Sequence, residues 1–514
     1  MTAAASAPFA DVCLLLEGTY PYTPGGVSSW VHNLIRDMGD LTFHVVSLLP
    51  GRELPPPRYE LPPNLVALTP VFVRALPEGA SWIWRMDALF AALEAPLFRL
   101  QEGGGLAEIV ALSRVLAPHR SRIGSRILLD SRPAWRLLHR MYQATHRHSS
   151  FLDYFWTWRC LYEGLFSALL TPLPPARLYH TVCTGYAGLL AARAHIETGR
   201  NVLLTEHGIY TNERRVEIAM ADWLHEAPAS SLELETRRRS LGDLWTRSFV
   251  SFSRACYEAS DRIVTLFEGN QRFQLEDGAP PERMCVIPNA VDFARYAALR
   301  ANAAPHPHTV ALIGRVVPIK DVKTFIRACA ELRRSVPALR AWVLGSADED
   351  PDYARQCRML VREMGLEATV TFHGQVRLED YFGQIDVVAL TSISEAQPLV
   401  ILEAGAAGIP MVATDAGSCR ELILGRAAES PPLGPGGTIT PPADPLATAE
   451  ALEALLKDPV WHASCSRALQ ERVRQYYNKD RIGHLYRELY RELLAAPAPR
   501  PPRERGREEH AWPA

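Results

Sequence analysis

Two glutamates, eight residues apart, stand on either side of a short apolar run in 394-SEAQPLVILEAGAAGIPMVATDAG-417. The run predicts a helix that begins at Leu399, so the first backbone amides, those of Leu399 and Val400, can bind a phosphate. Glu395 would project from the loop before this helix, and Glu403 lies about one turn into it. Ionised carboxylates accept pairs of hydrogen bonds from vicinal hydroxyls. Two acids flanking a phosphate site therefore indicate a nucleotide sugar, although the helix dipole alone would favour either glutamate taken singly.

Two cations precede this site in the chain, within 313-IGRVVPIKDVKTFI-326. Arg315 follows the end of a predicted strand, and Lys320 stands just before a predicted helix. Basic residues elsewhere are almost all arginine, and two of only four lysines in the chain fall in this loop. A compact ammonium differs from a guanidinium in the geometry it offers, so Lys320 and Arg315 are candidates to bind a diphosphate. Simple solvation of an exposed side chain explains either cation taken alone.

A glycine pair, Gly25 and Gly26, follows the first predicted strand and precedes a helical pattern in 17-EGTYPYTPGGVSSWVHNLIRDMG-39. Glycines there let the backbone approach a ligand closely, and the helix start offers N–H groups to an anion. A tight turn explains the pair about as well. The acidic run 348–350 precedes another helical pattern, where it is expected to act as a cap or a solvated loop, so no metal ion and no other cofactor is expected.

The elements that must position these residues alternate between short apolar strands and helical patterns. Runs typical of parallel strands fall into two series. The first series comprises 12–16, 43–50, 177–185, 201–208, 262–267 and 284–291, and the second comprises 309–316, 340–345, 369–374, 387–392 and 410–415. Two such series predict an α/β protein with two Rossmann-like, doubly wound domains that face a central cleft. Ligands bind outside the carboxyl ends of the strands in such sheets.

The predicted domains are an N-terminal one over 1–295 and a C-terminal one over 296–475, followed by a helix over 476–494 that crosses back to the first domain. Residues 495–514 are rich in Pro, Arg and Glu, a composition typical of a disordered tail. A helical insertion over about 75–172 interrupts the first domain and carries aromatic stripes. We expect these stripes to be helix packing faces, and docking onto a membrane-embedded partner is the alternative.

The bulk composition is that of an ordinary globular protein. Of the 514 residues, 47% are hydrophobic and 22% charged, with a formal net charge of -2. This balance indicates no nucleic-acid partner. Nine cysteines are scattered without a CxxC pair, which is typical of reduced thiols in a cytoplasmic protein. We expect no signal peptide and no membrane span, because no apolar run reaches the required ~18 residues.

The ordered series TPGGVSSW, VIPNAVD, IGRVVPIKD, FHGQ, EAQPLVILE and TITPPADP resembles the retaining glycosyltransferases of family 4, which have the GT-B fold. This series spans nearly the whole chain. The opening LLLEGTYPYTPGGVSSWVHNLI and the triplet 206-EHG-208 resemble more narrowly the Pel-type exopolysaccharide branch of that family. The resemblance implies transfer of a hexose or N-acetylhexosamine from a nucleoside-diphosphate sugar, expected to be a UDP-sugar, to a growing polysaccharide acceptor with retention at the anomeric carbon.

The resemblance also implies roles for residues that match the family motifs. Arg315 and Lys320 match the positions that neutralise the donor diphosphate, Glu403 the position that binds the ribose, and Glu395 the position that contacts the donor sugar. The N-terminal domain becomes the acceptor side and the C-terminal domain the nucleotide-sugar side. No aspartate is placed as a covalent nucleophile, so the resemblance implies a reaction on one face of the sugar.

Three further matches lie in the N-terminal domain. Gly25 and Gly26 match the glycine loop beside the diphosphate, and His207 matches a family histidine near the sugar, although a histidine at a strand end is often structural. Two departures from the family pattern, Pro398 and Ala290, stand where glycine is common and predict a slightly altered donor position.

Two other functions fit the same motifs. A sugar-nucleotide epimerase or hydrolase with the GT-B fold would act on the donor without an acceptor. A non-catalytic subunit of an inner-membrane synthase complex would bind nucleotide sugar and never turn it over, with the aromatic insertion as its docking face.

Overall fold

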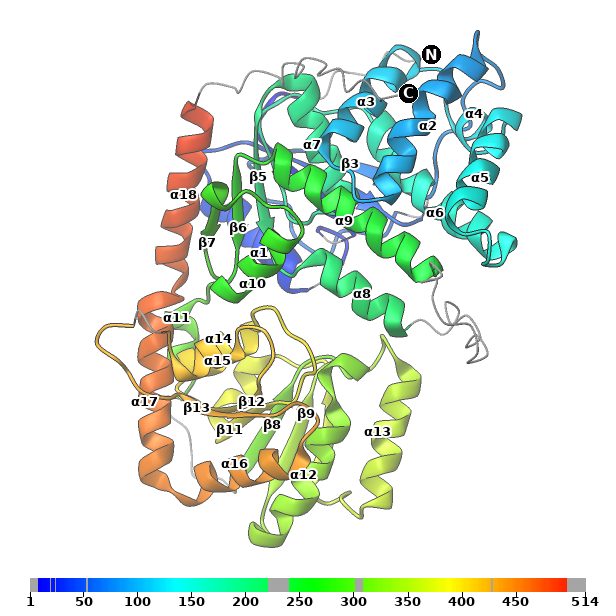
Figure 1. Ribbon diagram of the computed structural model, residues 1–514. Coiled ribbons are helices and arrows are strands. Elements are labelled where there is room, and N and C mark those ends of the chain that lie inside the picture. Colours follow the sequence, from blue (N-terminus) through cyan, green and yellow to red (C-terminus); the bar gives the residue numbers. More distant parts are fainter. Residues whose placement is uncertain are drawn as a thin grey trace, which may run out of the picture. The chain divides into compact units, whose positions relative to one another are not determined.

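The computed structural model (Figure 1) describes residues 8–18, 20–23, 25–51, 54–220, 240–300, 308–426 and 429–496. The chain divides into two compact units. Unit 1 combines Met1–Thr265, Gln271–Val286 and Arg487–Ala514, and unit 2 combines Leu266–Asn270 and Ile287–Tyr486. Of the tail predicted to be disordered, residues 497–514 lie outside the described ones.

Unit 1 is built on a seven-stranded parallel sheet with the order β3-β2-β1-β4-β5-β6-β7. Its strands are β1 (Ala10–Glu17), β2 (Phe43–Leu49), β3 (Leu65–Phe72), β4 (Ala176–Thr181), β5 (Asn201–Glu206), β6 (Arg262–Thr265) and β7 (Met284–Val286). The chain leaves β1 toward β2 and β3 on one side and returns to add β4 to β7 on the other. The direction of winding therefore reverses between β1 and β4, where a doubly wound sheet forms its crevice.

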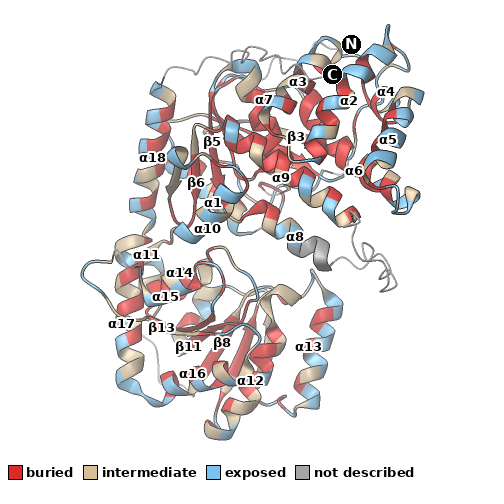
Figure 2. Cartoon of the chain, in the orientation of Figure 1, coloured by how far each residue is buried: buried red, intermediate tan, exposed pale blue. Residues whose placement is uncertain are grey.

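Helices cover this sheet and form the insertion between β3 and β4. The sheet-associated helices are α1 (Gly26–Asp37), α7 (Tyr186–Thr198), α8 (Tyr210–Met220), α9 (Leu241–Ala259) and α10 (Glu268–Glu276). The insertion consists of α2 (Met86–Gln101), α3 (Leu106–Leu116), α4 (Ser125–Leu128), α5 (Arg132–Thr145) and α6 (Phe151–Leu170). Most of α6 is buried in one continuous core with α2, α3, α7 and α9 (Figure 2). The expectation that the aromatic stripes are mainly packing faces is thus confirmed for α6.

Unit 2 repeats the plan with a six-stranded parallel sheet in the order β10-β9-β8-β11-β12-β13. Its strands are β8 (Thr309–Ile313), β9 (Arg340–Leu344), β10 (Val370–Gly374), β11 (Val387–Leu390), β12 (Met411–Thr414) and β13 (Gly437–Thr440). Its helices are α11 (Phe293–Ala297), α12 (Val322–Ser335), α13 (Pro351–Glu363), α14 (Leu399–Ala406), α15 (Cys419–Leu424), α16 (Pro445–Lys457) and α17 (Pro459–Tyr476). The winding reverses between β8 and β11.

The prediction of two doubly wound α/β domains with a helical insertion in the first is confirmed. The C-terminal helix is present as α18 (Lys479–Ala495), and its residues from Arg487 onward group with unit 1. Two strands were missed by the sequence patterns, β3 and β13. Among the described helices, none combines the length and apolarity that crossing a bilayer requires. All nine cysteines are free thiols.

Candidate functional site

The loops that follow β8 and β11 meet where the winding of the unit 2 sheet reverses. The Thr391 hydroxyl after β11 donates to the backbone carbonyls of Lys320 (3.1 Å) and Asp321 (2.9 Å) after β8. The amide of Ile393 donates to the carbonyl of Ile319 at 2.9 Å. These bonds fix the two loops to each other, at the place where a doubly wound sheet binds its ligand.

Lys320 and Glu395 are brought into direct contact by these loops. The Lys320 Nζ donates to Glu395 Oε1 at 2.5 Å. The two side chains are only 19% and 9% exposed. A pair so far removed from water interacts more strongly than an exposed pair, and each partner would be costly to leave alone. The sequence placed these residues in one site through separate roles, and their direct pairing was not foreseen.

Close backbone packing holds the Glu395 loop from the side of β12. Gly417 has a φ of +54°, and a Cβ on it would lie 2.0 Å from the carbonyl oxygen of Glu395. The amide of Ser418 donates to the carbonyl of Ala396 at 2.9 Å. Any larger residue at position 417 would push the loop away, so glycine is needed here for both conformation and space.

Gln397 is a buried residue of this loop that sequence reasoning missed. Its Oε1 accepts from the amide of Asn289 at 2.5 Å, and its backbone carbonyl accepts from the Asn289 side chain at 3.1 Å. Its Nε2 donates to the carbonyl of Leu266 at 3.2 Å. The only signal for this role was a polar residue inside an otherwise apolar run. Gln397 fixes the loop that carries Glu395 immediately before α14 begins.

The helix start predicted at Leu399 is confirmed, with Pro398 as its N-cap residue. Pro398 has no side chain that could cap the helix, so no side chain competes for the first amides of Leu399 and Val400. Glu403, one turn later, accepts a hydrogen bond from the Tyr296 hydroxyl at 3.0 Å. Burial raises the pKa of Glu403, and the bond from Tyr296 opposes that shift.

Arg315 lies in the same loop as Lys320 but has a different partner. Its guanidinium contacts Glu349 at 2.5 Å, and both side chains are more than half exposed. Such exposed pairs are weak and exchange readily with another anion. Of the acidic run 348–350, Asp350 caps α13 by accepting from the Tyr353 amide at 2.9 Å. The run is therefore a cap and an ion-pair partner, as its sequence context suggested.

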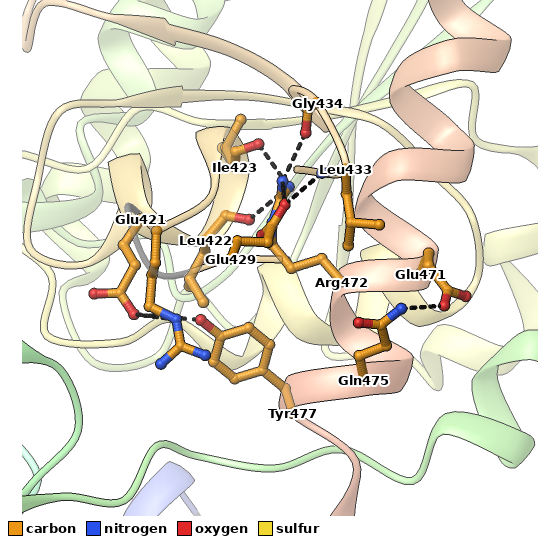
Figure 3. A network of polar contacts seen from close by, with 11 residues as sticks. Glu421, Leu422, Ile423, Glu429, Leu433, Gly434, Glu471, Arg472, Gln475 and Tyr477 are labelled. Atoms are coloured by element: carbon orange, nitrogen blue, oxygen red, sulfur yellow. Dashed lines mark hydrogen bonds and ion pairs between the residues drawn. The ribbon is translucent and has the colours of Figure 1, made fainter. Parts of the chain in front are cut away.

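A buried arginine, Arg472, forms an ion pair and hydrogen bonds with the segment between β12 and β13. Arg472 on α17 forms an ion pair with Glu429 at 2.7 Å, and the two side chains are 1% and 5% exposed. The same guanidinium donates to the carbonyls of Ile423 and Gly434, at 2.9 and 2.6 Å (Figure 3). Because Ile423 lies in the last turn of α15, whose N-cap residue is Ser418, this network anchors the helix that follows the backbone contact between Ser418 and Ala396.

The predicted site residues of unit 1 lie on α1 and β5. Gly25 is the N-cap residue of α1, in an extended conformation, and Gly26 is the first residue of the helix. No described atom lies within 4 Å of the place a Cβ on Gly25 would occupy. Packing among the described residues therefore does not require glycine at position 25.

His207 follows β5 and packs edge-on against Trp30 of α1, with ring centroids 4.6 Å apart. Burial lowers the pKa of His207 to about 4, so its imidazole is neutral at pH 7. Its Nε2 is buried without a hydrogen-bond partner among the described residues. His44 and His373 also each have one ring nitrogen without a partner among the described residues, so the unpaired Nε2 of His207 leaves it able to bind a ligand but does not single it out.

The preceding residue, Glu206, is buried and holds β5 to three other elements. Its carboxylate accepts from the Tyr257 hydroxyl and the Gln274 side chain, both at 2.8 Å, and from the Tyr210 amide at 3.2 Å. Burial raises the pKa of Glu206 to about 7, and these three donors counteract part of that shift. Glu206 therefore fixes the end of the strand from which His207 projects.

Within unit 2 the structure brings together Lys320 and Glu395 and carries Arg315, Leu399 and Glu403 on the same two connections. Gly25, Gly26 and His207 belong to unit 1, with Trp30 linking α1 to His207.

Family models match a long stretch of each unit. Residues 10–282 match the family described as a domain of unknown function, DUF3492, which covers more than half of the 514 residues. The chain belongs to this family. Residues 307–458 of this DUF3492 protein match the family described as glycosyl transferases group 1.

Curated relatives of the DUF3492 protein include several D-inositol 3-phosphate glycosyltransferases. The one from Kineococcus radiotolerans is 34% identical over 223 residues, which are 39% of this chain and 50% of the relative. The one from Nocardia farcinica is 37% identical over 176 residues, 31% of this chain and 38% of the relative. The chain thus spans half or less of the length of these relatives.

Solved structures agree with this chain over nearly its whole length. A sucrose-phosphate synthase from Thermosynechococcus elongatus has a TM-score of 0.56 at 19% identity, covering 94% of this chain and 99% of that one. HepE from Anabaena, in complex with UDP, has a TM-score of 0.57 at 16% identity, covering 94% and 100%. These are GT-B glycosyltransferase folds, so the predicted fold class is confirmed.

Proposed function

We propose that this protein is a retaining glycosyltransferase that transfers a hexose or N-acetylhexosamine from a UDP-sugar to a growing exopolysaccharide of the Pel type. The observation that carries the proposal is the contact between Lys320 and Glu395 at the reversal of the unit 2 sheet, immediately before the helix start at Leu399. A cation, an acid and a row of helix amides are the complementary groups for a diphosphate that joins two polyols.

In this proposal each part of the nucleotide sugar, namely the diphosphate, the transferred sugar and the ribose, binds to its own set of protein groups. The Lys320 ammonium and the Arg315 guanidinium bind the diphosphate, together with the amides of Leu399 and Val400. Glu395 accepts from hydroxyls of the transferred sugar, and Glu403 accepts from the ribose. The exposed Arg315–Glu349 pair supports this assignment because an exposed pair is easily exchanged for a phosphate. Glu403 is partly buried and accepts a hydrogen bond from the Tyr296 hydroxyl, which favours a hydrogen-bonding role over a repulsive charge near phosphate.

The reaction exchanges one bond at the anomeric carbon for another on the same face. The bond from that carbon to the diphosphate oxygen breaks, and the bond to the acceptor oxygen forms. The departing diphosphate oxygen takes the proton of the acceptor hydroxyl, so no protein base is required. Lys320 and Arg315 stabilise the charge that develops on the leaving group. His207, neutral at pH 7, and the glycine pair 25–26 would bind the donor from unit 1.

The finer assignment to UDP and to Pel-type synthesis has separate support. A solved structure of similar fold, HepE, is described with UDP-glucose bound. The opening stretch and the triplet 206-EHG-208 resemble PelF, the cytosolic glycosyltransferase of Pel exopolysaccharide synthesis. We propose a cytoplasmic location on the same grounds, with a protein partner in an inner-membrane synthase complex.

The decisive experiment incubates the purified full chain with UDP-, GDP- and ADP-sugars, with and without oligosaccharide acceptors. We expect UDP release that depends on an acceptor and an α-linked product from an α-linked donor, read by proton NMR. A β-linked product would overturn the retaining mechanism. UDP release or sugar interconversion without an acceptor would indicate a hydrolase or epimerase. Tight binding with no turnover on any acceptor would indicate a nucleotide-sugar-binding subunit.

A further inference from the structure

One segment of the helical insertion carries a charge that differs from the rest of the chain. Residues 120–160 contain eight arginines and two aspartates, a formal charge of +6, whereas the whole chain has a formal charge of -2. This segment forms α4, α5 and the first half of α6. A basic surface on an otherwise slightly acidic protein indicates an anionic partner. None of the residues assigned to the donor site lies in this segment.

Helix α5 presents this charge on its outward face. Ala134, Leu137, Leu138 and Met141 are buried and recur at helical spacing, so they define the inner face. The exposed residues lie on the other side of the helix (Figure 2), and they are Arg132, Trp135, Arg136, His139, Arg140, Gln143 and Ala144. Ser131 caps the helix by accepting from the Ala134 amide at 3.2 Å. Of the outer residues, Arg136 and Arg140 pair with Asp87 and Glu94 of α2, whereas Arg132 has no ion-pair partner among the described residues.

Large apolar side chains stand exposed beside these arginines. Trp135, Leu152 and Trp156 are 48%, 63% and 58% exposed. The two tryptophans pack against phenylalanines of α6: the Trp135 ring centroid lies 5.6 Å from that of Phe151 and 5.9 Å from that of Phe155, and the Trp156 centroid lies 5.0 Å from that of Phe155. Residues at the start of α6 thereby extend the surface of α5. We call Arg132, Trp135, Arg147, Leu152 and Trp156 the basic aromatic face.

Five of the eight arginines in residues 120–160 form ion pairs, and three do not. The pairs join Arg120 to Glu197, Arg126 to Glu78, Arg136 to Asp87, Arg140 to Glu94 and Arg159 to Asp130. Arg122, Arg132 and Arg147 have no carboxylate partner among the described residues, and Arg147 donates to the ring of His148 at 3.1 Å. Unpaired arginines beside exposed tryptophans form an arrangement that favours the boundary between lipid headgroups and acyl chains. Tryptophan and leucine bury there while arginine meets the headgroup phosphates.

We propose that the basic aromatic face binds directly to the surface of an anionic lipid bilayer. An exposed leucine and exposed tryptophans gain free energy in the acyl boundary, whereas stacking on nucleic-acid bases would use the aromatic rings but not Leu152. The phosphates of the headgroups supply the charge that complements Arg132 and Arg147. The contact requires no spanning helix and no protein partner, so it goes beyond the synthase complex proposed above. It is also independent of the donor site.

The test measures co-sedimentation of the purified full chain with vesicles of phosphatidylcholine alone and of phosphatidylcholine with about 30% phosphatidylglycerol. We expect the anionic vesicles to bind the protein at least about tenfold more tightly, with an affinity that falls as salt rises from about 0.05 to about 0.5 M. Equal binding to both vesicles, or no binding to either, would overturn the proposal. Binding to single-stranded RNA without binding to either kind of vesicle would indicate a nucleic-acid partner and would also overturn the proposal.

Matched variants locate the contact. Leu152→Ser should weaken binding to anionic vesicles severalfold, whereas Leu446→Ser, at a leucine 60% exposed in unit 2, should not change it. The double variant Arg132→Glu with Arg147→Glu should weaken binding at least about tenfold. These side chains lie at the surface, so thermal unfolding should stay at the wild-type midpoint, and donor-dependent UDP release should persist in all three. Equal losses in the Leu446→Ser control would refute this location.

Discussion

The two sheets reverse their winding in the same way, between β1 and β4 in unit 1 and between β8 and β11 in unit 2, yet the two reversals carry different chemistry. In unit 2 a lysine and a glutamate meet there at 2.5 Å. In unit 1 the corresponding strand β1 ends in Glu17, whose carboxylate accepts from the Tyr210 hydroxyl at 2.8 Å. All four lysines of the chain lie in unit 2.

Burial of histidines in unit 1 increases the chemical difference between the two sheet reversals. The histidines near the unit 1 reversal are held neutral, because burial lowers the pKa of His180 to about 3 and that of His207 to about 4. Both ring nitrogens of His180 are bonded within the protein, to the hydroxyls of Tyr490 and Thr205, which leaves the neutral His207 to hydrogen-bond with a sugar hydroxyl. The cations of unit 2 instead suit a diphosphate. Topology therefore fixes where each unit can bind a ligand, and the side chains at that place decide which ligand it is.

The largest expected effect comes from removing the support of the unit 2 loops. Arg472→Met leaves the buried carboxylate of Glu429 without its cation, and breaking a buried pair costs about 3–5 kcal/mol of the free energy of unfolding. Chemical denaturation of the full chain would measure this loss. The control is Arg474→Met on the same helix, whose pair with Glu471 is 54% and 35% exposed, so it should cost less than about 1 kcal/mol. Equal losses would show that α17 tolerates neither change.

In unit 1 the counterpart is the buried acid Glu206, and its effect depends on pH. The pKa of Glu206 is raised to about 7 in the folded state from 4.5, so between these values the folded state binds more protons than the unfolded one. The free energy of unfolding therefore falls as pH rises through that window, by about 3 kcal/mol in total.

Glu206→Gln removes this titration. Asp277 lies nearby, and burial raises its pKa as well, but it is present in both proteins and its contribution cancels in a comparison of the two. The unfolding free energy of the wild type minus that of the variant should therefore decrease from pH about 4.5 to about 7. Parallel pH profiles for the two proteins would contradict the buried, raised-pKa state of Glu206.

Lys320 tests the donor site itself. Lys320→Ala should cost about 2–5 kcal/mol at the transition state, since it also leaves the nearly buried Glu395 unpaired. We expect kcat/KM to fall more than ~30-fold. The kcat/KM of Lys320→Arg should lie between those of Lys320→Ala and the wild type, because the larger planar guanidinium keeps the charge but cannot occupy the same position as the compact ammonium. Lys323→Arg, in the exposed pair with Gln356, should change nothing. Near-normal kcat/KM in a folded Lys320→Ala protein would remove Lys320 from the site.

The sequence alone predicted the strands with uninterrupted apolar runs and the helix start at Leu399. It did not predict β3, because Pro70 and the partly buried residues of this edge strand weaken the apolar pattern. It also did not predict β13, which is only four residues long. Motif order predicted which residues share a site in unit 2. It could not predict that Lys320 and Glu395 pair, because a loop-to-loop contact depends on the backbone bonds that Thr391 makes.

Residues that act by supporting others were also invisible in the sequence. Gln397 and Arg472 look like ordinary polar residues of a loop and a helix, and their roles come from burial beside specific carbonyls and amides. Glu206 was noticed only as part of a motif. Its three donors come from Tyr257, Gln274 and the Tyr210 backbone, which the fold gathers from distant parts of unit 1.

Glu403 sharpens the comparison within the donor site. In the proposed donor site Glu403 accepts a charge-assisted hydrogen bond from the ribose. Such a bond contributes about 1.5–3 kcal/mol, so we expect Glu403→Ala to lower the affinity for UDP about tenfold or more. In the same proposal Glu395 contacts the sugar that UDP lacks, so Glu395→Ala should lower turnover and leave the affinity for UDP nearly unchanged. Isothermal titration with UDP separates the two. If UDP binds Glu403→Ala as tightly as the wild type, Glu403 does not bind the ribose.

The smallest expected effect is that of removing divalent metal ions. If Lys320, Arg315 and the amides at the start of α14 supply the charge that stabilises the leaving diphosphate, a metal ion adds little to the transition state. The acids 348–350 are used as a cap and an ion-pair partner, which leaves them poorly arranged as a metal site. We therefore expect UDP release to change less than about twofold when a chelator is added. Activity that disappears with the chelator and returns with Mg²⁺ or Mn²⁺ would show that the cations of unit 2 do not suffice, and the contrast between the two sheet reversals would then rest on a bound ion instead.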